Sequence, residues 1–146
     1  MDDVAFMQRA LALAASGVGR TGDNPSVGCV IVKAGAIVAE AATAEGGRPH
    51  AEEQALARAG VEASGSTVYV TLEPCARRST GGASCADLLI QAGVSRVVIA
   101  THDPHPYAAG VGVERLRAAG VQVDVGMRES EARAQNAAFF ARWDKP

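Results

Sequence analysis

One histidine, two cysteines and one glutamate near the middle of the chain have side chains that could hold a zinc ion and use it. His50 and Glu52 are separated by one residue, and Cys75 and Cys85 follow later in the sequence. Zinc in a catalytic site typically has three protein ligands of nitrogen or sulfur type and keeps its fourth position for water. The sequence therefore predicts that His50, Cys75 and Cys85 bind zinc, which leaves Glu52 for the reaction.

Glu52 is the candidate proton shuttle of this site. Zinc lowers the pKa of bound water from about 16 towards about 7, so hydroxide forms near neutral pH. A hydroxide that attacks an amidine-like ring carbon must pass its proton to the departing amine, and a carboxylate within hydrogen-bond distance of both can transfer it. We therefore expect Glu52 to be the catalytic residue of a hydrolytic removal of an amino group.

Other interpretations exist for each of these residues. The three ligands also fit a structural zinc site, although such sites usually have four protein ligands. Cys29 lies in an apolar run and is expected to be core. Glu52 could merely stabilise the first turn of a helix, as could Glu53, which is expected to be an exposed charge. Glu73, next to the metal-binding stretch, fits a supporting role as well as a catalytic one.

Local elements must position the four residues. Side chains at positions i and i+2 of a regular helix do not share a face. Pro49 is favoured in the first turn of a helix, so His50 and Glu52 are expected where the chain enters the helix and can point into one pocket. Cys75 follows a strand-like run, and Cys85 precedes a run of helical periodicity. Each thiol would then lie near a helix N-terminus, where the thiolate is favoured.

The pattern along the chain predicts strands alternating with helices after an opening hairpin. Expected helices cover residues 2–16, with Asp2 or Asp3 as the cap, 50–59, 86–92, 108–119 and 128–143, and expected strands cover 27–32, 37–41, 67–72, 96–100 and 121–125. A helix between the last two strands lets them run parallel. The sequence therefore predicts an α/β fold, a three-layer α-β-α sandwich around a mixed five-stranded sheet whose last two strands are parallel.

Composition limits the classes of function. The 146 residues, 48% of them hydrophobic, predict a single domain over residues 1–146. The formal net charge of -2 and the pI near 5.9 argue against extended nucleic-acid binding, and no run approaches the roughly 20 apolar residues of a membrane span. The start lacks signal-peptide order, and three cysteines are odd in number. We expect a cytoplasmic protein whose partners are small molecules or copies of itself, in a homodimer or a higher homo-oligomer.

The motif resembles a known superfamily. His50-Ala51-Glu52, followed by Pro74-Cys75 and a second cysteine, is similar to the H-x-E and P-C-x-x-C signature of the zinc-dependent cytidine deaminases. Here nine residues, 76–84, separate the cysteines. That long separation resembles the deaminase domain of the bifunctional riboflavin-biosynthesis protein, the diaminohydroxyphosphoribosylaminopyrimidine deaminase. The runs 24–32, 69–75 and 103–104 also resemble that family.

The resemblance implies a cytidine deaminase-like fold and a set of substrate contacts. These contacts are Asn24, the backbone groups of Ala51 and Leu72, and Arg78, Asp103 and His105. The cysteine loop departs from the family by one extra residue, by Arg77 in place of a histidine and by the loss of two prolines. His105 departs from the family's Asp-Pro-Asn-Pro loop near the substrate phosphate.

The leading hypothesis is a zinc-dependent hydrolase that releases ammonia from an aminopyrimidine. The resemblance implies the phosphoribosylated diaminopyrimidine of riboflavin biosynthesis as the substrate. A second hypothesis is a deaminase of another nucleobase, a nucleoside or a tRNA adenosine. A third, of another class, is a zinc-stabilised binding domain without turnover.

Overall fold

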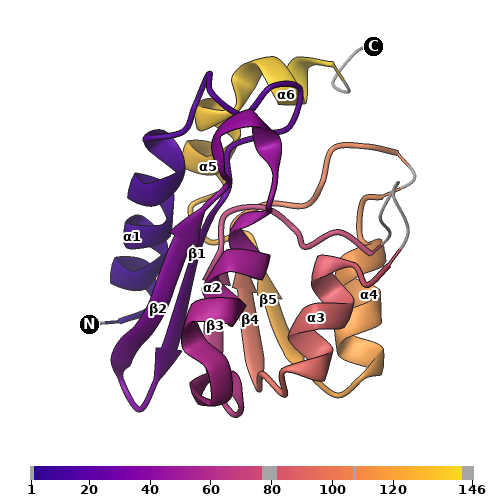
Figure 1. Cartoon of the computed structure of the whole chain (residues 1–146). Helices are drawn as coiled ribbons and strands as arrows, with labels where there is room; N and C mark the ends of the chain where they lie inside the picture. The colour runs from indigo at the N-terminus through magenta and orange to yellow at the C-terminus, as the bar shows by residue number, and fades with distance from the viewer. Residues whose placement is uncertain (1, 77–81, 107, 143–146) are drawn as a thin grey trace.

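A computed structural model describes residues 2–76, 82–106 and 108–142 of the chain (Figure 1). The elements in chain order are α1 (Asp3–Ala15), β1 (Gly28–Lys33), β2 (Ala36–Ala42), η1 (Glu45–Gly47), α2 (Ala51–Ala59), η2 (Gly60–Ala63), β3 (Thr67–Val70), α3 (Cys85–Gln91), β4 (Arg96–Ile99), α4 (Val111–Ala118), β5 (Gln122–Val125), α5 (Glu129–Gln135) and α6 (Ala137–Ala141). Within this described part, no helix is both long enough and apolar enough to cross a bilayer.

The five strands form one mixed sheet in the order β2-β1-β3-β4-β5. Strand β1 is antiparallel to both β2 and β3, whereas β3 and β4, and β4 and β5, are parallel. The parallel pairs need long crossovers, which α3 and α4 provide. The expected mixed sheet with parallel last strands is therefore confirmed.

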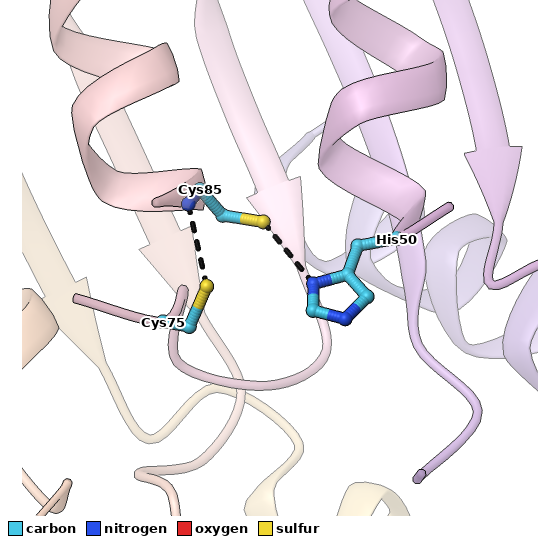
Figure 2. A group of neighbouring side chains, drawn as sticks. All are labelled: His50, Cys75 and Cys85. Atoms are coloured by element: carbon cyan, nitrogen blue, oxygen red, sulfur yellow. Dashed lines mark hydrogen bonds between the residues drawn. The ribbon is translucent and has the colours of Figure 1, made fainter. Parts of the chain in front are cut away.

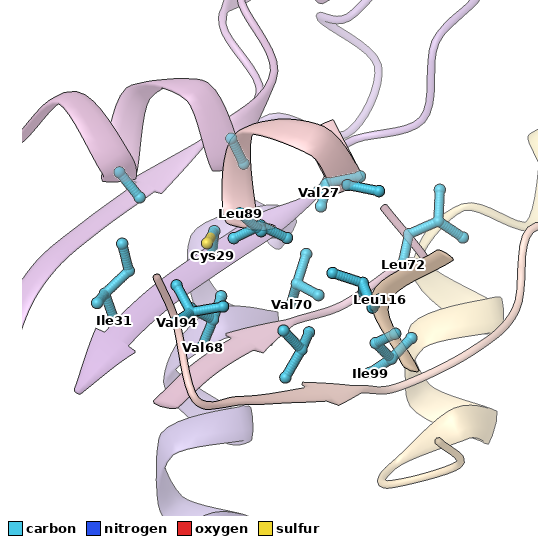
Figure 3. Close-up of a cluster of buried hydrophobic side chains, with 14 of the residues drawn as sticks. Val27, Cys29, Ile31, Val68, Val70, Leu72, Leu89, Val94, Ile99 and Leu116 are labelled. Carbon is cyan, nitrogen blue, oxygen red and sulfur yellow. The ribbon is translucent and has the colours of Figure 1, made fainter. Parts of the chain in front are cut away.

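Alternating side chains of the strands divide the core into two layers. On one face, Cys29 and Ile31 of β1 pack with buried residues of α2, α3 and α4 (Figure 3). On the other face, Val30 and Val32 pack with α1 and with Ala132 of α5. Figure 1 shows α1 along one side of the sheet and α2, α3 and α4 on the other. The expected three-layer α-β-α sandwich is confirmed, and Cys29 is core, as its apolar surroundings indicated.

Helix α1 lies unusually close to β1. Asp2 caps the helix, because its side chain accepts a hydrogen bond of 2.9 Å from the Ala5 backbone N–H. Where the helix crosses the strand, a Cβ atom on Gly28 would lie 1.8 Å from the carbonyl oxygen of Ala10. Only glycine therefore permits this approach.

Two expected helices differ from the observed ones. The helix expected over 108–119 begins only at Val111, because Gly110 before it has φ 82°, a left-handed conformation that cannot be part of the helix. The helix expected over 128–143 is broken into α5 and α6 at Asn136, whose φ of -113° and ψ of 40° are not helical. Residue 143, the expected end of that helix, lies outside the described residues.

Replacing Gly28 with alanine should destabilise the fold. The new Cβ atom would meet backbone of α1, which cannot rotate away as a side chain can, so α1 must shift from the sheet. We expect the free energy of unfolding to fall by about 3 kcal/mol, as for other overpacked sites. Urea denaturation of Gly28→Ala measures this value, and a change below about 0.5 kcal/mol, as at an ordinary surface position, would contradict the close approach.

Candidate metal centre and active site

His50 and Glu52 lie where the chain enters α2. His50 is the residue before the helix, with φ -68° and ψ 159°, and Glu52 is in the first turn. Because His50 is extended and Glu52 is helical, both side chains line one cavity in spite of their i, i+2 spacing. The expected position of His50 and Glu52 at the helix entrance is confirmed, but Pro49 precedes the helix and does not lie in its first turn, because α2 begins at Ala51.

Glu53 supports this entrance. Its Oε1 accepts a hydrogen bond of 3.1 Å from the backbone N–H of His50, and its side chain is half-buried. The expectation that Glu53 is an exposed charge is therefore wrong. An unpaired N–H group at the helix start is satisfied by this carboxylate, as in other capped helices.

The two cysteines are joined through the backbone at the start of α3. Cys85 is the first residue of that helix, and its backbone N–H donates to Cys75 Sγ at 3.3 Å. The next N–H, of Ala86, donates to the carbonyl oxygen of Cys75 at 3.0 Å. Ser84 caps the helix by accepting from the Asp87 N–H at 3.1 Å. The start of α3 is thus held directly against Cys75.

The imidazole and the two thiols meet in space (Figure 2). The possible ligand atoms of His50, Cys75 and Cys85 all lie within 4.8 Å of one another, and His50 Nδ1 is 3.4 Å from Cys85 Sγ. Tetrahedral zinc with bonds of about 2.3 Å to sulfur and about 2.0 Å to nitrogen implies ligand separations of about 3.5 to 3.8 Å. The donor types and their spacing therefore fit one zinc ion with three protein ligands.

The pKa values of the two thiols are shifted in opposite directions. Hydrogen bonds from Cys85 and then from His50 lower the pKa of Cys75 to about 4, against the opposing effect of burial. The same contact with Cys75 raises the pKa of Cys85, and burial raises it further. The hydrogen bond with Cys75 also raises the pKa of His50. Because the thiolate is the form that binds metal, Cys75 is already prepared to be a ligand.

Glu52 is a buried acid beside this group. It is 4% exposed, and burial, the largest effect, raises its pKa to about 7. A carboxyl group with a pKa near neutrality can both accept and donate a proton at the same pH. The position and the proton affinity of Glu52 thus suit a proton shuttle.

A cavity of about 160 Å³ opens over these side chains. It is lined by Asn24, Pro25, Val27, Thr43, His50, Glu52, Leu72, Glu73, Cys75, Asp103 and Phe139. The predicted substrate contacts Asn24, Leu72 and Asp103 are thus brought together.

The other predicted contacts are not among the described residues that line the cavity. Ala51 is fully buried, His105 donates its backbone N–H to Asp103 Oδ1 at 2.9 Å, and neither is among the described residues that line the cavity. Arg78 lies outside the described residues.

Glu73 connects the segment before Cys75 with the loop that follows β4. Its carboxylate is buried, and its Oε1 accepts hydrogen bonds from His102 Nδ1 at 3.1 Å and from the backbone N–H groups of Asp103 at 3.1 Å and Gly110 at 3.0 Å. Its Oε2 accepts from the Val113 N–H at 3.0 Å. We call these contacts the Glu73 network. They fix the loop of Asp103 and the start of α4.

Gly112 allows this arrangement. A Cβ atom there would lie 2.1 Å from the carbonyl oxygen of Pro74 and 3.3 Å from Glu73 Cγ. The first turn of α4 therefore lies directly against the residue that precedes Cys75. Arg115, in the same helix, donates to the carbonyl oxygen of Ala76 at 2.8 Å. Helix α4 thus contacts the residues before and after Cys75, Pro74 and Ala76.

Sequence reasoning missed three features of the cavity. The sequence left the role of Glu73 open between support and catalysis, because nothing in it indicates which N–H groups converge on the carboxylate. Thr43 has no recognisable signal. Phe139 was not among the predicted site residues; it packs against the core and also lines the cavity.

The chain resembles proteins of known family. Residues 1–101 match the cytidine and deoxycytidylate deaminase zinc-binding region. The riboflavin biosynthesis protein RibD of Escherichia coli is 49% identical over 142 residues, a match that covers 97% of this chain and 38% of RibD. The diaminohydroxyphosphoribosylamino-pyrimidine deaminase of Buchnera aphidicola is 42% identical over 142 residues, which cover 97% of this chain and 96% of that protein.

A solved structure shares the fold. The RibD protein of Acinetobacter baumannii superposes with a TM-score of 0.92 and 42% identity, over 98% of this chain and 40% of that one. The chain thus spans about two fifths of the length of these RibD proteins.

Glu73→Gln should loosen the start of α4. A glutamine oxygen can replace Oε1, but its NH₂ group then faces the Val113 N–H, which is left unpaired. A buried unpaired donor costs about 1 to 3 kcal/mol, so we expect the free energy of unfolding to fall by about 2 kcal/mol. We also expect faster hydrogen exchange of the Val113 and Gly110 amides.

Glu114→Gln is the matched control for this variant. It removes an exposed carboxylate from the first turn of the same helix, where only an interaction with the helix dipole of about 0.3 to 1 kcal/mol is lost. Equal amide exchange in the two variants would contradict the Glu73 network.

Proposed function

Because the chain belongs to the cytidine and deoxycytidylate deaminase family, we propose that it is a hydrolase that releases ammonia from an aminopyrimidine. The proposed substrate is the phosphoribosylated diaminopyrimidine of riboflavin biosynthesis, the class of compound in the name of the Buchnera relative. One observation carries the proposal. Three potential metal ligands meet within 4.8 Å at a cavity that is also lined by the buried carboxylate of Glu52.

Zinc is the cofactor, and we propose His50, Cys75 and Cys85 as its three protein ligands. When bound, zinc supplies a Lewis acid that lowers the pKa of water at its open position to about 7. The described residues offer one imidazole and two thiols at this point, which matches the three-ligand type of catalytic site.

Glu52 moves the protons of the proposed reaction. Water adds across the C=N bond of the ring, so that its oxygen joins the carbon and one proton goes to the ring nitrogen. The bond from that carbon to the exocyclic nitrogen then breaks, the second proton leaves with the nitrogen as ammonia, and the carbon keeps the oxygen as a carbonyl. A carboxyl group with a pKa near 7 can accept each proton and deliver it.

The cavity supports a small flat substrate. Its volume of about 160 Å³ is below the roughly 300 to 1,000 Å³ of pockets that hold drug-sized ligands, so it suits the ring alone. We propose that Asn24, Asp103 and the backbone of Leu72 contact the ring and the groups next to it. The phosphoribosyl group would extend outwards, where His105 and Arg78 are the proposed contacts, and Ala51 would contribute backbone groups.

We further propose that residues 1–146 act as one deaminase domain in the cytoplasm, as a homodimer or a higher homo-oligomer. The acidic pI of about 5.9 supports a small-molecule substrate over extended nucleic acid.

A panel of amines tests the proposed function. Purified, zinc-loaded protein is incubated with the phosphoribosylated diaminopyrimidine, cytidine, deoxycytidylate, guanine and a tRNA with an unmodified anticodon adenosine. We expect ammonia release from the first compound, with kcat/KM at least about 100-fold above that for the others, because contacts outside the reacting ring contribute to transition-state binding. Ammonia release only from another member would replace the proposed substrate.

Glu52→Gln serves as the inactive control in the same assay. Loss of the proton shuttle should lower kcat by about 100- to 10,000-fold while zinc stays stoichiometric. Glu53→Gln is the matched variant, because its amide oxygen can still accept from the His50 N–H, and it should keep most of the activity. Unchanged ammonia release by Glu52→Gln would exclude Glu52 as the shuttle.

Removal of zinc separates an enzyme from a zinc-stabilised binding domain. The hydrophobic core lies between the sheet and the helices and does not depend on the three ligands, so the metal-free protein should stay folded. We expect a chelator to abolish ammonia release, added zinc to restore it, and the far-ultraviolet circular dichroism to stay unchanged. Complete unfolding on chelation would instead favour a purely structural metal.

A further inference from the structure

The break between α5 and α6 places one polar side chain against the substrate loop. Asn136, at the break, accepts a hydrogen bond from the Ser26 N–H with its Oδ1 and donates to the Ser26 carbonyl oxygen with its Nδ2, both at 2.8 Å. Ser26 is fully buried. A single side chain thus pairs both backbone groups of Ser26, as a neighbouring strand would.

Ser26 belongs to the segment that lines the cavity. Asn24 and Pro25, just before it, are lining residues. The segment is also held from other sides, because Ser26 Oγ donates to the Ala14 carbonyl oxygen at 2.6 Å and Asn24 Nδ2 donates to the Gly47 carbonyl oxygen at 3.1 Å. Figure 1 shows α6 beside this part of the chain. Asn136 therefore fixes the position of the C-terminal helices relative to Asn24.

Phe139 follows Asn136 by three residues and lines the same cavity. Its neighbour Phe140 is only 3% exposed and packs into the core, with the ring centroids of the two phenylalanines 5.7 Å apart at an interplanar angle of 89°. The Arg133 guanidinium lies 4.5 Å from the centre of the Phe140 ring. Phe140 thus anchors α6, and Phe139 is left half-buried at the cavity.

The chemistry of the cavity suits a flat heterocycle. Phe139 is the aromatic residue among the described lining residues, beside the apolar side chains of Val27 and Leu72. The faces of an aminopyrimidine are apolar and its edges are polar, so its faces need apolar or aromatic contacts.

We propose that Phe139 contacts the face of the substrate ring and contributes to specificity, and that Asn136 is a positioning residue that holds Phe139 and the Asn24 segment at the correct separation. This inference rests on the proposed deaminase function. It adds the C-terminal helices to a site whose metal-binding part lies within residues 1–101.

Variants of Phe139 test the aromatic contact. With the phosphoribosylated diaminopyrimidine, Phe139→Leu should raise KM about tenfold, since stacking of a base on an aromatic ring contributes on this order. Its kcat should change less than about threefold, because Phe139 does not move protons. Phe139→Tyr keeps the ring and should keep KM near the wild-type value. Leucine and tyrosine variants with the same KM would overturn the aromatic contact.

A binding measurement removes any dependence on turnover. In the Glu52→Gln background, calorimetry should show about tenfold weaker binding of the same compound after Phe139→Leu. Zinc content should be equal in both proteins. If the wild-type protein deaminates no compound of the panel, the proposed function fails. If it does deaminate one and Phe139→Leu binds that compound normally, the inference alone fails.

Asn136→Ala tests the positioning role against a matched control. Gln135→Ala removes a comparable amide contact, since Gln135 Nε2 donates to the Leu11 carbonyl oxygen at 2.7 Å, but this contact ties α5 to α1 and not to the substrate segment. Asn136→Ala should lose more stability in urea than Gln135→Ala, because it removes two hydrogen bonds and Gln135→Ala removes one. We expect KM to rise about tenfold for Asn136→Ala and to stay unchanged for Gln135→Ala. An equal rise in both variants would reduce Asn136 to general structural support and overturn the proposal.

Discussion

The arrangement of the site depends on one buried carboxylate. Glu73 precedes the Pro74-Cys75 pair, is 3% exposed, and is balanced by three backbone N–H groups and by His102. Burial of a charge without hydrogen-bond partners strongly destabilises the folded state. The loop after β4 and the start of α4 therefore have to lie where their N–H groups can bind Glu73. The same contacts that satisfy Glu73 therefore hold the segments of Asp103 and Cys75, both of which line the cavity.

The segment of Asn24 and Pro25, which also lines the cavity, is held in the same way, by a side chain that pairs with buried backbone groups. There Asn136, a neutral side chain, satisfies the backbone of a buried residue, Ser26. In both cases a side chain binds main chain that has no partner in a helix or the sheet. Such contacts fix the path of a loop whatever side chains the loop has.

Much of the fold could be predicted because its signals are local. The apolar periods of the strands, the proline before His50 and the capping residue Asp2 each act within a few positions, and the elements they predicted are present. The convergence of His50, Cys75 and Cys85 was also predictable, because an imidazole and two thiols in that order are typical of a zinc site.

The features that were missed are those that long-range contacts decide. The stretch around α5 and α6 is rich in alanine, glutamate and arginine, which favour one continuous helix, and Asn136 lowers that preference only slightly. Its pairing with Ser26, 110 positions away, breaks the helix. Phe139 follows that break in α6, where its half-buried ring packs against the core and also lines the cavity. Glu53 was misjudged for a local reason, the need of the His50 N–H for a partner.

The positions of the cavity residues along the chain determine the order in which they leave the ribosome. The potential zinc ligands lie between positions 50 and 85, whereas Phe139 is the last of the described residues that line the cavity. A nascent chain therefore exposes its metal-binding side chains well before α6 has left the exit tunnel. An ion could therefore be captured by these side chains before the wall of the cavity is complete.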